Sequence, residues 1–474
     1  MLFNSLAFFY FMTTTYLLYI VLKHNSQNLL LLAASYFFYG WWDWRFLGLI
    51  SISTAVSYLT AIKIEEASTE RQKRFYLILA AAFALGLLGL FKYYNFFSQS
   101  FVQLIGLFGV RTNWTELHLI LPIGISFYTF QALGYTIEVF RGSFKACRRP
   151  LDFALFVSFF PLLLSGPIER ANRLLPQIQT SRKVTLDDVT SGSWLILFGL
   201  FKKIAIADGL ARLVDPVFSA NAGYSGFDIL VATYVYVLQL YCDFSGYTDI
   251  ARGVARLMGF LIMENFRTPF YAVSPSDFWT RWHISLSSWV RDYVYLPLAL
   301  RYMRDRDGVG NQYKPHIYTM LLMGLWHGAA WTYIFWGIYN GFMLVLWDAL
   351  KWPSFLQGLR ARIPRAFWVF LYFQVTAGLM LIFRANSVHQ VGEFLKKIFT
   401  NFGGLTLHVV PPSPVTVVGI PLFLVLDYLA YRKGRERFFD EWRPPVRGTL
   451  YASLFALLLM GWTNTPAQFI YFNF

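Results

Sequence analysis

The chain has 474 residues, of which 56% are hydrophobic, 20% are aromatic and only 14% are charged. Ordinary soluble domains carry about 25% charged residues, and here the deficit falls in long apolar blocks. A transmembrane β-barrel would instead alternate apolar and polar residues over segments of about 10 residues. The composition therefore predicts an all-α polytopic membrane protein, embedded in a lipid bilayer.

The net charge of +15 is explained by this setting. Basic residues cluster in the connections 63–74, 141–150 and 431–448, as the positive-inside rule requires of cytosolic loops. This distribution places the N-terminus and the C-terminus on the outer side and gives no reason to expect nucleic acid as a partner. The two cysteines provide neither a disulfide framework nor a thiolate metal site.

The apolar blocks predict a series of spanning helices and some shorter pieces. The expected spans, in chain order, lie near residues 3–22, 27–42, 46–62, 75–91, 118–140, 227–246, 247–262, 315–347, 366–383, 411–430 and 449–464. The stretches 151–166 and 191–201 are too short to span, which predicts re-entrant or tilted segments. We expect about eleven transmembrane helices plus re-entrant and amphipathic interfacial helices.

No soluble domain interrupts this pattern, so we expect one integral-membrane domain over residues 1–474. Within it we distinguish N-terminal helices (1–140), a core that carries the candidate site (141–350) and C-terminal helices (351–474).

The most informative block is the run of 33 residues between Lys314 and Asp348, which contains no Asp, Glu, Lys or Arg. A span needs about 20 residues, so the run has room for a break or a second helix. His327 lies inside the run, and an ionisable group within the membrane is a candidate for a functional site. A low dielectric keeps an imidazole neutral, which is the form that a general base requires.

A structural role for His327 is the alternative. Gly324 and Gly328 flank it at a spacing that lets a neighbouring helix approach closely, and Gly337 and Gly341 repeat this spacing. The histidine would then be a hydrogen-bonding residue between packed helices.

A second candidate is the stretch 278–295, which is dense in Trp and Tyr. Read as one helix, it places His283, Leu286 and Val290 on the same face. This composition is typical of a helix at the membrane interface, and a plain anchor is the alternative interpretation. A histidine among rings also suits the wall of a cavity or channel.

Asp243 and Asp249, beside a predicted span, form a third set. Two carboxylates there suit a metal site or general-acid catalysis, and equally the capping of a helix break or pairing with Arg252. Without nearby His or Glu residues, no metal is predicted.

Nine motifs follow one another along most of the chain. They are Asn28–Trp42, Phe91–Phe96, Leu121–Phe130, Phe159–Pro161 with Ser165–Pro167, Asp243–Tyr247, Glu264–Phe266, Arg281–Leu286, Trp326–Gly328 and Phe469–Phe474. In this order they resemble the membrane-bound O-acyltransferase (MBOAT) superfamily, in particular its bacterial alginate O-acetyltransferase-like branch. Glu138 and the stretch 165–170 depart from the expected pattern, which leaves the substrate subgroup open.

The resemblance implies the MBOAT fold and transfer of acetyl groups across the bacterial inner membrane, for O-acetylation of an exopolysaccharide or cell-wall polysaccharide. His327 matches the essential histidine of the family and His283 its second histidine motif, so both are expected to be catalytic. The expected lining of the substrate channel is Trp282, Trp289, Trp326, Asp243, Ser245 and Asn340.

Acetyl-CoA is the expected donor, with no bound cofactor, and Arg141, Arg148 and Arg149 on the cytosolic side suit its phosphates. The expected partners are a periplasmic acetyltransferase and the machinery of polysaccharide synthesis and export.

Two alternative functions stay open. The same fold suits transfer of D-alanine from a carrier protein to teichoic acid. A transporter or polysaccharide export channel, with His327 as a proton relay, belongs to a different class.

Overall fold

The computed structural model describes residues 1–110, 112, 117, 119–219, 223–304, 312–350, 362–463 and 467–470. These residues form helices and, within the described ranges, no strand. The all-helical class is therefore confirmed. Two compact units divide the chain, residues 1–193 with 251–263 and residues 194–250 with 264–474. The expected single domain with three parts stays a prediction.

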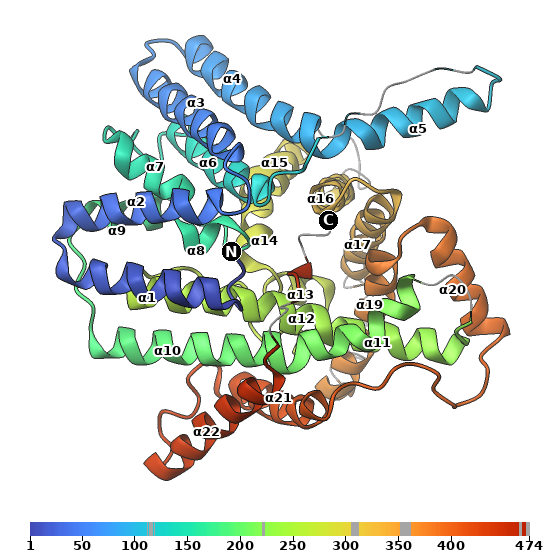
Figure 1. Cartoon of the computed structure of the whole chain (residues 1–474). Helices are drawn as coiled ribbons and strands as arrows, with labels where there is room; N and C mark the ends of the chain where they lie inside the picture. Colours follow the sequence, from blue (N-terminus) through green and yellow to red (C-terminus); the bar gives the residue numbers. More distant parts are fainter. Residues whose placement is uncertain are drawn as a thin grey trace. The chain divides into compact units, whose positions relative to one another are not determined.

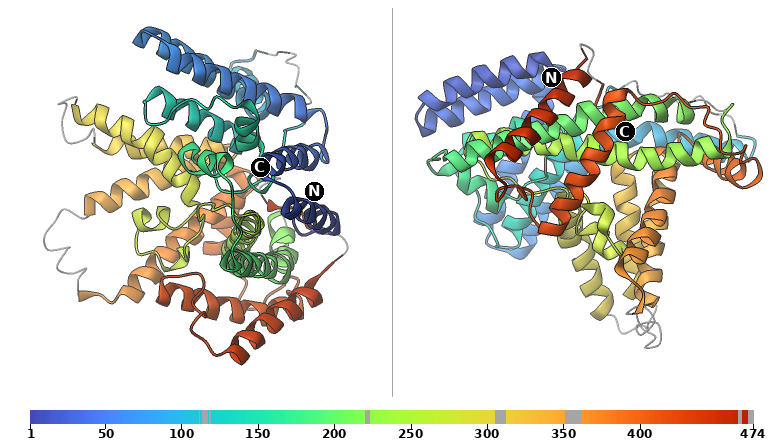
Figure 2. Two further views of the ribbon diagram at one scale, coloured as in Figure 1. Left: turned by 90° about the vertical axis from the view of Figure 1, so that its left-hand side faces the viewer. Right: turned by 90° about the horizontal axis from the view of Figure 1, so that it is seen from below.

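The first unit contains the N-terminal helices (Figure 1). They are α1 (Leu6–Val21), α2 (His24–Gly40), α3 (Phe46–Glu66), α4 (Glu70–Leu88), the π-helical turn η1 (Gly89–Tyr93), α5 (Tyr94–Gly106), α6 (Ile125–Phe140), α7 (Pro150–Ser158), α8 (Phe160–Leu163) and α9 (Ala171–Gln179). Helices α3 and α4 lie side by side, in blue in Figures 1 and 2.

Helix α4 continues through η1 into α5, so that one helical segment covers Glu70–Gly106. The expected end of a span near residue 91 is wrong, because polar residues are accommodated within the helix. The side chain of Asn95, for example, donates to the carbonyl oxygen of Leu117 and accepts from its N–H, at 2.7 and 3.0 Å. The expected span 118–140 is shorter than predicted, since α6 begins only at Ile125.

The stretch 151–166 is short and broken, as expected. Helix α7 ends at Ser158, Phe159 has a non-helical backbone, and α8 contains Pro161. Phe156, Phe159 and Phe160 are all fully buried. Irregular backbone in a membrane protein is tolerated where protein surrounds it, and this segment satisfies that condition.

Two long helices differ from their predicted lengths. Helix α10 (Leu186–Leu200) continues through the π-helical turn η2 (Phe201–Ala207) into α11 (Asp208–Ser219), so the expected short segment 191–201 is part of a longer helix (Figure 1). Helix α12 (Gly226–Leu257) is one helix of 32 residues where two spans were expected. In both helices, charged side chains interrupt the apolar sequence. Ion pairs between the two helices, Lys202 with Asp249 and Lys203 with Asp243, accommodate these side chains in the structure.

The second unit contains the remaining helices. They are the short 3-10 turn η3 (Pro269–Tyr271), α13 (Pro275–Trp279), α14 (Ile284–Val290), the π-helical turn η4 (Arg291–Tyr295), α15 (Leu296–Arg304), α16 (Lys314–His327), α17 (Trp331–Leu350), α19 (Arg365–Arg384), α20 (Val388–Thr400), α21 (Pro414–Lys433) and α22 (Pro444–Gly461). The expected spans 366–383, 411–430 and 449–464 correspond to α19, α21 and α22.

Among the described residues, six helical segments are long and apolar enough to cross a membrane. They are Phe46–Glu66, Glu70–Gly106, Gly226–Leu257, Trp331–Leu350, Arg365–Arg384 and Pro414–Lys433. Helix α1 is apolar but has only 16 residues.

Candidate active site

His327 is the last residue of α16, at a break in the long uncharged run. Gly328 follows it with extended backbone, and its N–H donates to the carbonyl oxygen of Gly324 at 3.4 Å. Helix α17 begins at Trp331, so the expected break in this run is confirmed. The histidine is 4% exposed.

Backbone contact between α16 and α17 fixes the end of α16. A Cβ atom on Gly324 would lie 2.2 Å from the carbonyl oxygen of Tyr333, and one on Gly337 would lie 2.4 Å from that of Met320. Only glycine permits this approach at either position. The predicted role of the small residues is confirmed, and the position of His327 depends on them.

Three aromatic rings pack edge-on against His327. The ring centroids of Trp326, Trp336 and Phe383 lie 5.1, 5.0 and 5.2 Å from that of the imidazole, all in edge-to-face geometry. Trp336 and Phe383 come from α17 and α19, so two neighbouring helices build this enclosure. Such an arrangement excludes bulk water and strengthens electrostatic interactions within the site.

His283 lies at a break and not on a continuous helix, which corrects the expected face shared with Leu286 and Val290. It precedes α14 with a left-handed backbone (φ 44°), an uncommon conformation for a residue other than glycine. Asn265 supports this turn, because its carbonyl oxygen accepts from the N–H of Ile284 at 2.9 Å and its Oδ1 from that of Ser285 at 3.1 Å. Asn265 lies in the motif Glu264–Phe266 but was not expected to be a residue of the site.

The imidazole of His283 is fully buried, and its burial lowers its pKa to about 3. Its ring contacts Phe244 edge-on, with centroids 4.7 Å apart, and Trp326 at 5.8 Å. Trp326 thus contacts both histidines, with ring centroids 5.8 Å from His283 and 5.1 Å from His327. The structure brings both histidines into one aromatic cluster of the second unit.

The other expected channel residues divide into two groups. Trp326 joins the two histidines, and Trp282, next to His283, packs on Phe266 with ring centroids 5.0 Å apart. The side-chain nitrogen of Asn340 donates to the carbonyl oxygen of Trp336 at 2.9 Å, beside the His327 enclosure. Trp289, by contrast, contacts Tyr293 at 4.9 Å, and Ser245 is buried in α12.

Asp243 and Asp249 bind buried lysines, which are partners that the sequence did not indicate. The Nζ of Lys203 lies 2.7 Å from Asp243, and that of Lys202 lies 2.5 Å from Asp249. Asp208 binds Lys203 as well, at 2.8 Å. Within the described residues, no group of three or more His, Cys, Asp or Glu side chains is placed to hold a metal ion.

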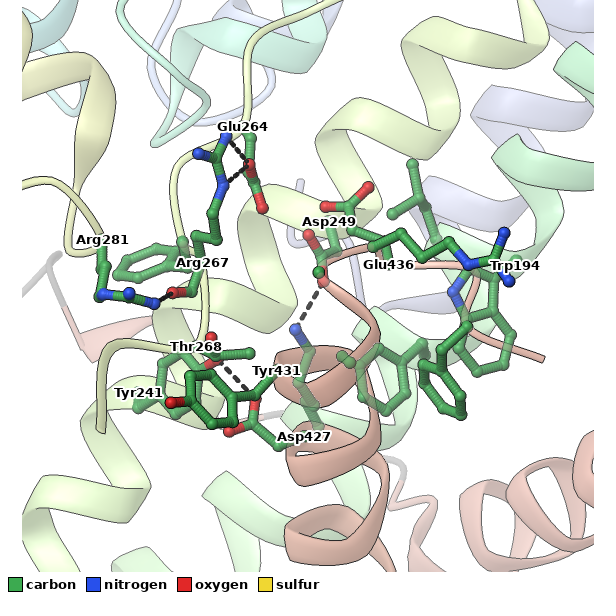
Figure 3. A pocket seen from close by; sticks show the side chains of 18 residues that line it. Trp194, Tyr241, Asp249, Glu264, Arg267, Thr268, Arg281, Asp427, Tyr431 and Glu436 are labelled. Atoms are coloured by element: carbon green, nitrogen blue, oxygen red, sulfur yellow. Dashed lines mark hydrogen bonds and ion pairs between the residues drawn. The ribbon is translucent and has the colours of Figure 1, made fainter. Parts of the chain in front are cut away.

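A polar pocket of about 440 Å³ opens beside the ion pair of Lys202 and Asp249 (Figure 3). Four cationic and four acidic side chains contribute to its wall: Lys202, Arg267, Arg281, Arg435, Asp249, Glu264, Asp427 and Glu436. The Arg267–Glu264 and Lys202–Asp249 pairs are drawn in Figure 3. The balanced charges suit a polar or zwitterionic group better than a polyanion.

A second pocket, of about 480 Å³, lies along α16. Met323 and Met320 line it, one and two turns before His327, and Trp279 adds an aromatic wall. Trp279 also contacts Trp336 edge-on at 6.0 Å. At its other end, the Nε2 of His316 lies 3.2 Å from the carboxylate of Asp348. The pocket therefore combines an apolar wall near the His327 enclosure with polar groups further away.

The three arginines expected to bind the donor belong to the first unit. Arg148 binds Glu65 and Glu66, with 2.8 Å to the latter, and Arg149 lies 3.3 Å from Asp152. Arg141 is exposed. Their role in donor binding stays a prediction.

Comparison with known proteins identifies the class to which this arrangement belongs. The model of the membrane-bound O-acyltransferase family matches residues 147–383, which include both histidines. The chain belongs to this family and is a multi-pass membrane O-acyltransferase.

Among individual relatives, the chain is 38% identical over 405 residues to the probable alginate O-acetylase AlgI of Azotobacter vinelandii, covering 85% of this chain and 78% of that protein. It is 29% identical over 483 residues to the peptidoglycan O-acetyltransferase of Helicobacter pylori, with 91% and 89% covered. It is 34% identical over 269 residues to the teichoic acid D-alanyltransferase of Streptococcus thermophilus, with 54% and 64% covered.

Proposed function

We propose that the protein transfers acetyl groups from a cytosolic donor across the bacterial inner membrane, for O-acetylation of an exopolysaccharide or cell-wall polysaccharide. The observation that carries the proposal is the enclosure of His327 and His283 by one aromatic cluster around Trp326. The relatives named alginate O-acetylase and peptidoglycan O-acetyltransferase support acetyl as the group transferred.

In this mechanism His327 is the general base. It takes the proton of the acceptor hydroxyl as the oxygen attacks the thioester carbonyl carbon. The C–S bond then breaks, and the thiolate leaves with the electron pair and takes up a proton. General-base catalysis typically contributes about 10²–10⁴-fold to the rate. The rings around His327 exclude water, which protects the thioester from hydrolysis.

His283 supports the reaction as a neutral imidazole. A neutral ring has one N–H, which serves to orient the acceptor or to stabilise the oxyanion as charge develops on the carbonyl oxygen. Its low pKa, caused by burial, makes a proton-transfer role for His283 unfavourable. His327 therefore carries the proton transfer.

Acetyl-CoA is the proposed donor, with Arg141, Arg148 and Arg149 as cytosolic contacts for its phosphates. The pocket along α16 suits an acyl thioester, because it is lined by Met320 and Met323 close to His327. The acceptor arrives from the periplasmic side. A periplasmic acetyltransferase, working with the machinery of polysaccharide synthesis and export, is the proposed recipient of the group.

The proposed topology has about eleven passages through the inner membrane, with both termini in the periplasm. The six long segments supply part of that number, and shorter helices such as α1, α2 and α22 supply further passages.

The test compares His327→Ala with His389→Ala, because His389 is an exposed histidine of α20, a helix that contributes no ring to the aromatic cluster described above. Acetyl-CoA-dependent release of CoA is measured in proteoliposomes, and O-acetyl groups are measured on polymer from cells that express each variant. We expect His327→Ala to lose at least about 100-fold of the turnover and His389→Ala to match wild type. A folded His327→Ala protein with wild-type turnover would falsify the base assignment.

The same preparation tests the two alternative functions. The relative named teichoic acid D-alanyltransferase favours D-alanyl transfer as the second candidate, which predicts turnover with a D-alanyl carrier protein and none with acetyl-CoA. A transporter predicts flux of protons or polysaccharide into liposomes without any acyl donor.

A further inference from the structure

The buried ion pair of Lys203 and Asp243 holds the last described residues of the chain. The Nζ of Lys203 lies 2.7 Å from Asp243 and donates a hydrogen bond to the carbonyl oxygen of Gln468 at 3.2 Å. The Oδ2 of Asp243 accepts from the N–H of Ile470 at 2.8 Å. Both ends of the tripeptide 468–470 are thus attached to one ion pair.

Few alternative partners are open to these charges. Lys203 is 1% exposed and Asp243 is 3% exposed. An ammonium group has three donor positions, and here they face Asp243, Asp208 and Gln468. A buried charge that loses a partner is unfavourable, so the ion pair and the tripeptide stabilise each other.

Phe469, between the two anchored residues, is fully buried although the preceding residues Ala467 and Gln468 are exposed. Its ring stacks on Tyr247 of α12, with centroids 4.5 Å apart and an interplanar angle of 25°. It also contacts Phe244, on the same helix, at 5.7 Å.

Phe244 connects this contact to the site. Its ring lies edge-on to His283, with centroids 4.7 Å apart and an interplanar angle of 82°. Phe266 packs against Phe244 at 5.0 Å. Phe469 and Phe266 therefore both pack against Phe244, and the ring of Phe244 packs against His283.

We propose that residues 468–470 form a strap, anchored by Lys203 and Asp243, that makes Phe469 a positioning residue for His283 through Phe244. The effect on turnover rests on the proposed function, whereas the anchoring does not.

The anchoring is tested without any activity measurement. Hydrogen–deuterium exchange is followed in the peptide that contains Ile470, in the full-length protein reconstituted in lipid. We expect Asp243→Ala to abolish the protection of that peptide, since the N–H loses its acceptor. Gln468→Ala keeps the backbone carbonyl and is the matched control, with wild-type protection. Wild-type protection in Asp243→Ala would overturn the strap.

The positioning is tested by kinetics. We expect Phe469→Ala to lower kcat roughly 10-fold to 100-fold, since a displacement of about 1 Å can cost 100-fold. The KM for acetyl-CoA should stay within about twofold, because residues 468–470 do not line the pocket proposed for the donor. Phe469→Leu should recover most of the kcat, and Gln468→Ala should equal wild type.

A double-mutant cycle separates positioning from a general loss of stability. If Phe469 acts through His283, Phe469→Ala should change kcat less than about twofold in a His283→Ala background. Losses that multiply would overturn the positioning role. Wild-type kcat in His283→Ala alone would overturn both the proposed function of His283 and the positioning role, while the exchange experiment would still decide the anchoring.

Discussion

The contact between α16 and α17 predicts a graded series of alanine substitutions. Ordinary contact of a Cβ atom begins at about 3.4 Å, whereas one on Gly324 would lie 2.2 Å from a backbone oxygen. The helices must therefore separate by about 1.2 Å for Gly324→Ala. The required separation of the helices is about 1.0 Å for Gly337→Ala. It is only about 0.4 Å for Gly341→Ala, where the nearest atom lies 3.0 Å from the added Cβ.

His327 follows Gly324 by three residues and ends the same helix, so the displacement reaches the imidazole. A misplacement of about 1 Å can cost 100-fold in rate. We therefore expect Gly324→Ala to lower kcat about 100-fold, Gly337→Ala somewhat less and Gly341→Ala only a few-fold. Overpacking also lowers the free energy of unfolding by about 1–3 kcal/mol for the two tighter positions.

The assay measures kcat and thermal unfolding in detergent for each variant. Gly378→Ala in α19 is the control, because no atom lies within 4 Å of the added Cβ, and it should match wild type. Wild-type kcat for Gly324→Ala, or losses that do not follow the order of the three distances, would refute the reasoning.

Two further predictions concern buried charge. His283 has a pKa of about 3 when folded and 6.5 when unfolded, so the unfolded chain alone binds its proton between these values. Protonation of His283 in the unfolded chain should therefore lower the free energy of unfolding by up to about 1.4 kcal/mol for each pH unit below pH 6.5. The His283→Asn variant should show a smaller decrease over the same pH range, because only the other titrating groups contribute to it. The Asp249→Asn substitution leaves Lys202 without its carboxylate partner and should lower the free energy of unfolding by about 3–5 kcal/mol, as measured by thermal unfolding. The double variant Lys202→Met with Asp249→Leu leaves no unpaired charge and should lower it much less.

A specific experimental result would contradict each of these two predictions. Equal pH slopes for wild type and His283→Asn between pH 6.5 and 5 would contradict the low pKa. A double variant as unstable as Asp249→Asn would contradict the view that an unpaired Lys202 is the cause.

The sequence predicted the parts of the site that depend on local pattern. The uncharged run predicted a break or a second helix, although not the place of the break beside His327, and its glycines predicted the close approach of a neighbouring helix, because both follow from spacing along one segment. The turn at His283 was not predictable, since its left-handed backbone depends on Asn265, a residue 18 positions earlier that only the fold brings close.

The lysine pairs illustrate the same limit. Lys202 and Lys203 ended an apolar window in the sequence, and Asp243 and Asp249 interrupted another. These charges predicted that the helices end there. In the structure the lysines of η2 pair with the aspartates of α12, so the charges neutralise one another and both helices continue. Which acid binds which lysine depends on the relative register of two helices, and no local pattern contains that information.

The π-helical turn η2 has a consequence for how this protein can vary. An α-helix advances about 100° per residue, and π-helical turns within α-helices are commonly found at functional sites. Removing one residue from Phe201–Ala207 would rotate every later residue of α11 by about 100° relative to α10. One of the two adjacent lysines, or the buried face of α11, would then point away from its partners. This segment should therefore accept substitutions of its apolar residues over evolution, yet reject insertions and deletions.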